Sequence, residues 1–170
     1  MKPLKRPARR SILVAHVAIS VGWLGLAVGL LALGLTAFLT HDAATAEAAT
    51  RAMKVFSDWL VVPVALLSLV SGLALALGTS WGLARHRWVW AKFWLTLITA
   101  GLSVFALRPA IDEAAARGAA DIDLVIAPSV ATATYLFVTA ISVLKPWGPT
   151  RRGRRLRPAR ESVSRPAGLG

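Results

Sequence analysis

The stretch Trp88-Val-Trp-Ala-Lys92-Phe-Trp-Leu-Thr96-Leu-Ile-Thr99-Ala-Gly-Leu-Ser103 decides how this chain folds. It opens an apolar run that continues to Leu107. The run is about 20 residues long, which is the length that a helix rising ~1.5 Å per residue needs to cross a hydrocarbon core of roughly 30 Å. We therefore predict a transmembrane helix here.

The polar residues of this run follow one helical stripe. Lys92, Thr96, Thr99 and Ser103 are separated by steps of four, three and four, so they lie on one side of the helix. A lysine at the centre of a bilayer costs roughly 2.5–3.5 kcal/mol on insertion scales. We therefore expect the stripe to face the interior of a helix bundle rather than lipid.

The composition is that of an integral membrane protein. Of 170 residues 56% are hydrophobic, and the mean hydropathy is +0.60. The chain has no cysteine, which excludes disulfides and thiolate metal sites. The net charge is +12, but the basic residues lie mainly in two tails beside apolar runs. We therefore expect them to meet anionic lipids and not nucleic acid.

Four apolar runs predict an all-α, polytopic membrane protein with a four-helix transmembrane bundle. The first run is too long for a signal peptide, whose apolar region spans roughly 7–15 residues, so we expect it to stay uncleaved. The predicted parts are a basic N-terminus (1–10), a transmembrane domain (11–147) and a disordered basic tail (148–170). The predicted spans cover about 11–40, 59–79, 88–107 and 124–144.

The connections between the spans contain helix start and stop signals. We expect Asp42 to cap a solvated helix over 43–58 that runs on into the second span, past Pro63. Arg108-Pro109 is expected to end the third span, followed by a short helix that Gly118 closes. Opposite charges four residues apart predict three ion pairs: Glu47–Arg51, Lys54–Asp58 and Glu113–Arg117.

The distribution of Lys and Arg predicts the orientation. Both termini and the connection near residues 80–87 are basic, whereas the other two connections are slightly acidic. By the positive-inside rule the termini are expected in the cytoplasm, with the chain in the cytoplasmic (inner) membrane.

A second polar face lies on the first span. His16, Ser20 and Trp23 share one side of the helix, and His16 is expected at the depth of Lys92 if both are counted from the cytoplasmic ends of their spans. Ser142 and Thr139 approach the same level from the fourth span. The predicted ligand-binding residues are His16, Lys92, Ser20, Thr96 and Trp23. The alternative is that His16 is satisfied by a hydroxyl or backbone partner while Lys92 extends to lipid phosphate.

No enzyme signature stands out, and whether the protein catalyses a reaction stays open. His41 and His86 are expected near opposite surfaces, which makes a metal site of three histidines geometrically implausible. The alternative function is a non-catalytic scaffold or a small transporter subunit. Such a protein would self-associate as a homo-oligomer through the GxxxG of Gly25 and Gly29.

Three motifs carry a resemblance to known families: His16-x6-Trp23, Trp88-x-x-Ala91-Lys92 and Val143-Leu-Lys145-Pro146-Trp147. They resemble HemJ-type protoporphyrinogen oxidase and the membrane domain of CopD-type proteins. The segment 71–92 looks even more like an uncharacterised bacterial family of integral membrane proteins. The resemblance implies a bacterial inner membrane and a functional His16–Lys92 pair associated with haem or porphyrin, with His16 as the haem ligand.

Overall fold

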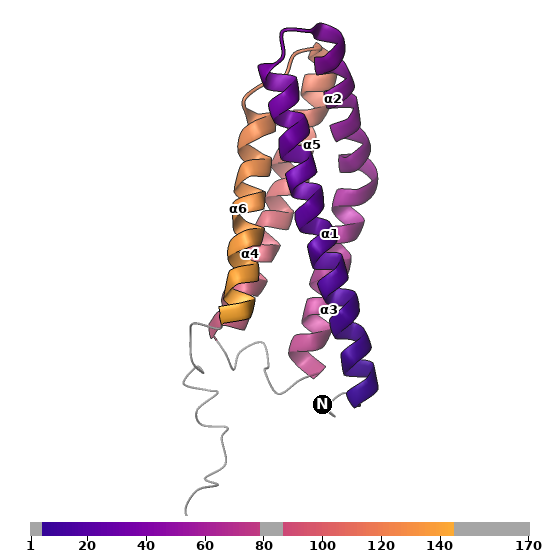
Figure 1. Ribbon diagram of the computed structural model, residues 1–170, viewed down its shortest axis with the longest axis vertical. Helices are drawn as coiled ribbons and strands as arrows, with labels where there is room; N and C mark the ends of the chain where they lie inside the picture. Colours follow the sequence, from indigo (N-terminus) through magenta and orange to yellow (C-terminus); the bar gives the residue numbers. More distant parts are fainter. Residues whose placement is uncertain (1–4, 79–86, 145–170) are drawn as a thin grey trace, which may run out of the picture.

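The computed structural model describes residues 5–78 and 87–144, and the regular structure in these segments is entirely helical. In these segments the helices form four long rods, which lie side by side (Figure 1). The all-α four-helix bundle is confirmed. The rods are α1 (Arg6–Leu39); α2 (Ala43–Phe56), η1 (Ser57–Val61) and α3 (Val62–Gly78); α4 (Arg87–Leu102), η2 (Ser103–Leu107) and α5 (Arg108–Arg117); and α6 (Asp123–Leu144). The predicted disordered tail and His86 lie outside the described residues.

All four rods are long and apolar enough to cross a membrane. Large apolar side chains cover the outside of the bundle; Val70 is 64% exposed and Phe105 is 83% exposed. A water-soluble protein rarely exposes apolar surface on all sides, whereas the hydrocarbon core of a membrane solvates such a surface well. The fold is therefore that of a membrane-spanning helix bundle.

The bundle has two distinct ends. We call the end with the connections 40–42 and 118–122 the loop end, and the opposite end, where α1 and α4 begin and α3 and α6 finish, the terminal end (Figure 1). Helices α1 and α4 each pack against both α3 and α6. This arrangement puts α1 and α4 on a diagonal of the bundle.

Two of the rods pass through a proline without breaking. Pro63 and Pro109 each follow a π-helical turn that begins with a serine, Ser57 in η1 and Ser103 in η2. Proline lacks an N–H and clashes with the carbonyl four residues earlier, and a wider turn just before it relieves that conflict. In η2 the Arg108 N–H donates to the Ser103 carbonyl, five residues back. The predicted break at Arg108-Pro109 is therefore wrong, while the predicted continuation past Pro63 is confirmed.

The predicted caps are confirmed. The Asp42 carboxylate accepts a hydrogen bond from the Thr45 N–H at 2.9 Å, as an N-cap should. The Thr45 hydroxyl and N–H together hold the pKa of Asp42 below its usual range. At the end of α5, Gly118 has a φ of 67°, and its N–H donates to the Ala114 carbonyl. Helix α1 begins at Arg6, earlier than the predicted start of its span.

The buried side chains form two clusters. The loop-end cluster comprises Leu30, Met53, Val61, Leu107, Ile111, Ala114 and Leu124. The central cluster comprises Trp23, Ala27, Ala65, Ala100, Ala131 and Tyr135. In α1 as described no residue before Trp23 is fully buried, and in α4 none before Thr99. At the terminal end α3 and α6 thus still bury Ala76 and Ile141, whereas the first turns of α1 and α4 bury no residue fully.

Helices α1 and α6 come closest at Gly34. A Cβ placed on Gly34 would lie 2.1 Å from the Leu124 carbonyl oxygen. Pro128, four residues after Leu124, has no N–H to donate to that carbonyl, so the oxygen is free to face α1. By contrast, a Cβ on Gly22 or Gly25 would meet nothing within 4 Å. Gly34 is therefore the glycine that packing within the bundle requires.

Candidate functional site

His16 is positioned by helix α3. Its ring lies against Gly72, where an added Cβ would come within 3.1 Å of Cε1. Its Nδ1 lies 2.8 Å from the Ser71 hydroxyl. The small residue and the hydroxyl thus make a seat for the imidazole on α3, which matches the alternative in which His16 has a hydroxyl partner.

The partners of Ser71 determine which imidazole nitrogen is basic. The Ser71 hydroxyl donates to the Leu67 carbonyl at 2.6 Å, and a hydroxyl has only one proton to give. It must then accept from the Nδ1–H of His16 when the imidazole is neutral. Nε2 keeps its lone pair, which can take up a proton or bind a metal ion.

Lys92 is positioned by helix α6. Its ammonium donates to the Ser142 hydroxyl, which in turn donates to the Val138 carbonyl at 2.7 Å. Within residues 5–78 and 87–144 no carboxylate forms an ion pair with Lys92. The side chain is half-buried. Lys92 therefore presents a positive charge that the described protein does not neutralise.

The two residues share the terminal end but are held by different neighbours. His16 is bonded to α3 and Lys92 to α6, and Lys92 lies within electrostatic range of His16. Helix α1 begins at Arg6, earlier than predicted. Counting residues from the start of each helix therefore does not give the depth of His16 relative to that of Lys92. The structure places His16 and Lys92 in one region without a direct hydrogen bond between them.

The other predicted residues lie further along their helices. Ser20 and Thr96 are half-buried, one turn beyond His16 and Lys92. Trp23 is 4% exposed, and its ring packs against the Tyr135 ring in a tilted arrangement, with centroids 4.6 Å apart and an angle of 42° between the ring planes, inside the central cluster. The Thr139 hydroxyl donates to the carbonyl of its own helix, at Tyr135. Of the predicted binding residues, Trp23 is thus the one engaged in the core.

The described segments contain no group of three or more His, Cys, Asp or Glu side chains able to hold a metal ion. His41 follows the last turn of α1 at the loop end, and about two-thirds of the length of α1 separates it from His16. Any metal at the terminal end would therefore draw on His16 as its single protein nitrogen from this part of the chain.

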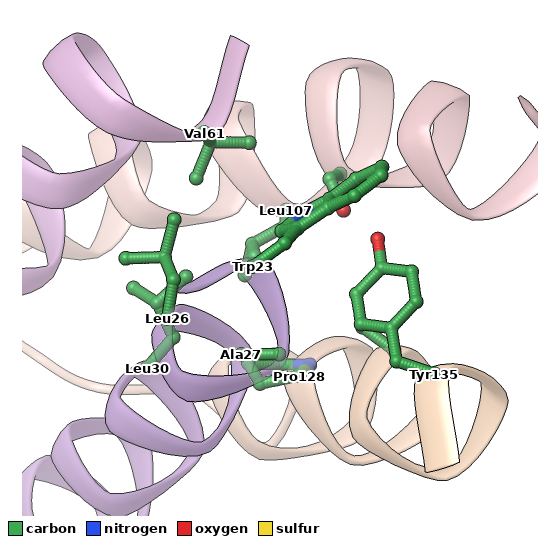
Figure 2. A pocket seen from close by; sticks show the side chains of 10 residues that line it. Trp23, Leu26, Ala27, Leu30, Val61, Leu107, Pro128 and Tyr135 are labelled. Carbon is green, nitrogen blue, oxygen red and sulfur yellow. The ribbon is translucent and has the colours of Figure 1, made fainter. Parts of the chain in front are cut away.

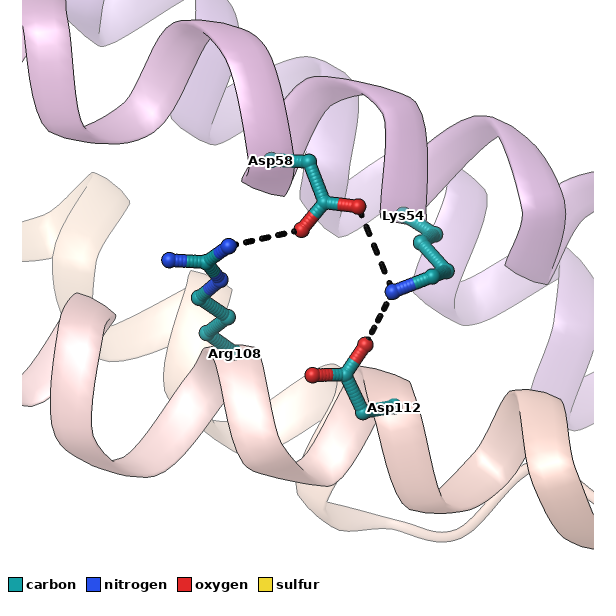
Figure 3. Close-up of polar contacts among 4 residues, drawn as sticks. All are labelled: Lys54, Asp58, Arg108 and Asp112. Atoms are coloured by element: carbon teal, nitrogen blue, oxygen red, sulfur yellow. Dashed lines mark hydrogen bonds and ion pairs between the residues drawn. The ribbon is translucent and has the colours of Figure 1, made fainter.

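A charge network joins the second and third rods toward the loop end (Figure 3). Asp58 accepts from Lys54 at 3.2 Å and from Arg108 at 3.1 Å, and Lys54 also pairs with Asp112. The sequence predicted the Lys54–Asp58 pair, which is confirmed with the other two helical pairs. It could not predict the pairs with Arg108 and Asp112, because these join distant parts of the chain. The network fixes the register between the two rods.

Comparison with known proteins returned no matching family model, no matching curated protein and no matching solved structure. The resemblance to HemJ-type and CopD-type proteins thus rests on its three motifs alone. The class is defined by fold and composition: an all-helical bundle with four helices able to span a membrane.

Proposed function

We propose that this protein binds an anionic amphiphile within the membrane, at the terminal end of the bundle between His16 and Lys92. One observation carries the proposal: the half-buried ammonium of Lys92 has no carboxylate partner in the described segments. An unpaired charge in an apolar environment is costly. A ligand with a carboxylate or phosphate group would supply the missing charge.

The incomplete burial of the first turns of α1 and α4 suits an added molecule. The nearest fully buried residues of α1 and α4 are Trp23 and Thr99, two turns further in. An amphiphile could place its polar group at Lys92 and its apolar body among the helices or in the adjoining lipid. In the alternative in which Lys92 reaches a lipid phosphate, the lipid is the amphiphile and its phosphate pairs with the ammonium.

Haem is the member of this class that would also use His16, whereas metal-free porphyrin would use Lys92 alone. The lone pair on Nε2 is suited to an iron ligand, and Ser71 would hold the ring as a second partner. Lys92 would bind a propionate. Bound haem would supply redox chemistry or ligand binding at its iron. Coordination by two histidines at this depth would need a second copy of the chain.

The test is a titration of the detergent-purified protein with haem and, separately, with metal-free protoporphyrin, followed by absorption. We expect His16→Ala to weaken haem binding at least ~10-fold, about 1.4 kcal/mol, but to leave metal-free porphyrin binding nearly unchanged. Lys92→Ala should weaken both. His41→Ala, at the loop end, is the matched control and should behave as wild type.

A wild-type protein that binds neither compound would remove the haem and porphyrin form of the proposal. The alternative function, as a scaffold or transporter subunit, would then be the better supported one. One observation favours it. Gly25 is exposed, and an added Cβ there would meet nothing within the bundle, so this face is free for a second copy. In that case Gly25→Leu combined with Gly29→Leu should weaken an oligomer, while His16→Ala should not.

The proposed orientation places the terminal end in the cytoplasm. The chain has five Lys and Arg residues before Ser11 and eight from Lys145 onward, whereas the segments 41–58 and 108–123, which link the predicted spans at the loop end, contribute two each. This asymmetry is the positive-inside pattern. A reporter that is active only outside the cytoplasm should be active when fused after Gly118. Its inactivity there, with the fusion protein expressed, would reverse the orientation.

A further inference from the structure

A small cavity lies at the centre of the bundle, away from the proposed ligand site. Its volume is about 10 Å³, and its wall is mostly apolar, with contributions from Trp23, Leu30, Val61 and Pro128. Two hydroxyl side chains also line it, Ser103 and Tyr135. A cavity of roughly this size holds a single water molecule, provided that polar partners are present.

Tyr135 supplies the first partner. The residue is 6% exposed, and its hydroxyl lies near the Ser103 hydroxyl but makes no hydrogen bond of ordinary length with any residue in the described parts of the chain. Figure 2 shows this hydroxyl directed away from α6, into the space beside the Trp23 ring. Buried hydroxyl groups are nearly always hydrogen-bonded, to protein or to ordered water. The Tyr135 hydroxyl therefore points to a ligand in the cavity.

Ser103 supplies the second partner. Its hydroxyl donates to the Thr99 carbonyl at 2.9 Å, which leaves the Ser103 oxygen able to accept. A water molecule can donate one proton to this oxygen and exchange a second hydrogen bond with Tyr135. We propose that the cavity binds one water molecule, held between the Tyr135 and Ser103 hydroxyls at the centre of the membrane-spanning bundle.

Two rows of hydroxyl groups lead from the terminal end to this cavity. The row on α4 runs from Lys92 through Thr96 and Thr99 to Ser103. The antiparallel row on α6 comprises Ser142, Thr139, Tyr135 and Thr132. Helices α4 and α6 pack together, and the Lys92–Ser142 hydrogen bond joins the rows at their outer end. In this proposal, the interface between the rows is one path by which the water reaches Tyr135.

Part of the cavity wall on the loop-end side is apolar. Leu30, Val61 and Leu107 line its wall and belong to the loop-end cluster. Ile111 and Leu124 of the same cluster are 0% exposed, so the next layer is tightly packed and apolar. A second pocket of about 270 Å³ nevertheless adjoins the cavity at Ser103 and Ala131 and extends past Ala110 to Asp123 at the loop end, so water can also approach from that side.

Solid-state NMR in lipid bilayers, with magnetisation transferred from water, tests the bound water. We expect transfer to the Tyr135 and Ser103 side chains to be at least ~3-fold faster than transfer to Ile111, the dry reference. Tyr135→Phe keeps the ring and removes the hydroxyl, so it should slow the transfer to Ser103. Equal rates at Tyr135 and Ile111 in the wild type would refute the water site.

Cysteine accessibility tests the route, because the native chain has no cysteine. Thr96→Cys lies on the α4 row, and Ile98→Cys is a control at nearly the same depth on the face that is 56% exposed to lipid. Silver ion added to proteoliposomes should block later labelling of the first thiol and spare the second. Equal reactivity of the two would refute the route. Neither measurement involves porphyrin. Failure of the water site or of the route would therefore leave the proposed ligand site untouched, and the reverse also holds.

Discussion

Gly34→Ala should destabilise the bundle by about 3 kcal/mol or more, the upper end of the range for inserting a methyl group into a packed core. The added Cβ would lie 2.1 Å from the Leu124 carbonyl oxygen and 3.0 Å from its carbon. Both are backbone atoms of α6 and cannot rotate aside, so α1 and α6 would have to separate. That separation would disturb contacts of Leu30 and Leu124 in the loop-end cluster.

Gly25→Ala is the matched control on the same helix. Its Cβ would meet nothing within 4 Å, and alanine is a better helix former than glycine by about 1 kcal/mol. The variant should therefore be as stable as wild type or more so. Reversible unfolding in mixed micelles of a mild detergent and dodecyl sulfate measures both variants. Equal stability of Gly34→Ala and Gly25→Ala would contradict the close approach of α1 to α6.

Trp23→Ala should cost about 3 kcal/mol or more, as do other truncations of large aromatic residues in packed interiors. Trp23 is 4% exposed, packs against the Tyr135 ring and belongs to the central cluster. In a membrane the loss is mainly of packing contacts, because lipid tails are as apolar as the protein interior. Helices α1 and α6 would both lose contacts at the centre of the bundle.

Trp59→Ala is the control for the loss of an indole. Trp59 is 75% exposed and lies on η1, so its removal should change the free energy of unfolding by less than about 0.5 kcal/mol. The same micelle titration compares the two variants. If Trp23→Ala were no more damaging than Trp59→Ala, the central cluster would not be a stabilising core.

Both stability predictions concern parts of the bundle other than the proposed ligand site. The fully buried residues of α1 begin at Trp23, whereas His16 depends on Ser71 and Gly72 of α3. Variants at His16 are therefore expected to change ligand binding with little effect on folding. This separation makes loss of binding in His16→Ala interpretable.

The sequence by itself determined the features that depend on local chemistry. Apolar runs of membrane length predicted the four rods, and the spacing of Lys92, Thr96, Thr99 and Ser103 predicted a stripe that does turn inward. The Asp42 cap and the Gly118 stop also follow from a few adjacent residues. Hydropathy, helical period and capping act within one or two turns, and they can therefore be read without knowledge of the fold.

Only the tertiary structure decided which residues of different helices meet. It placed Ser71 against His16, Ser142 against Lys92 and Arg108 against Asp58. It also replaced the predicted break at Pro109 by a π-helical turn. These outcomes depend on the order and rotation of helices around the bundle, because packing between distant segments sets both and no periodicity within one helix encodes them.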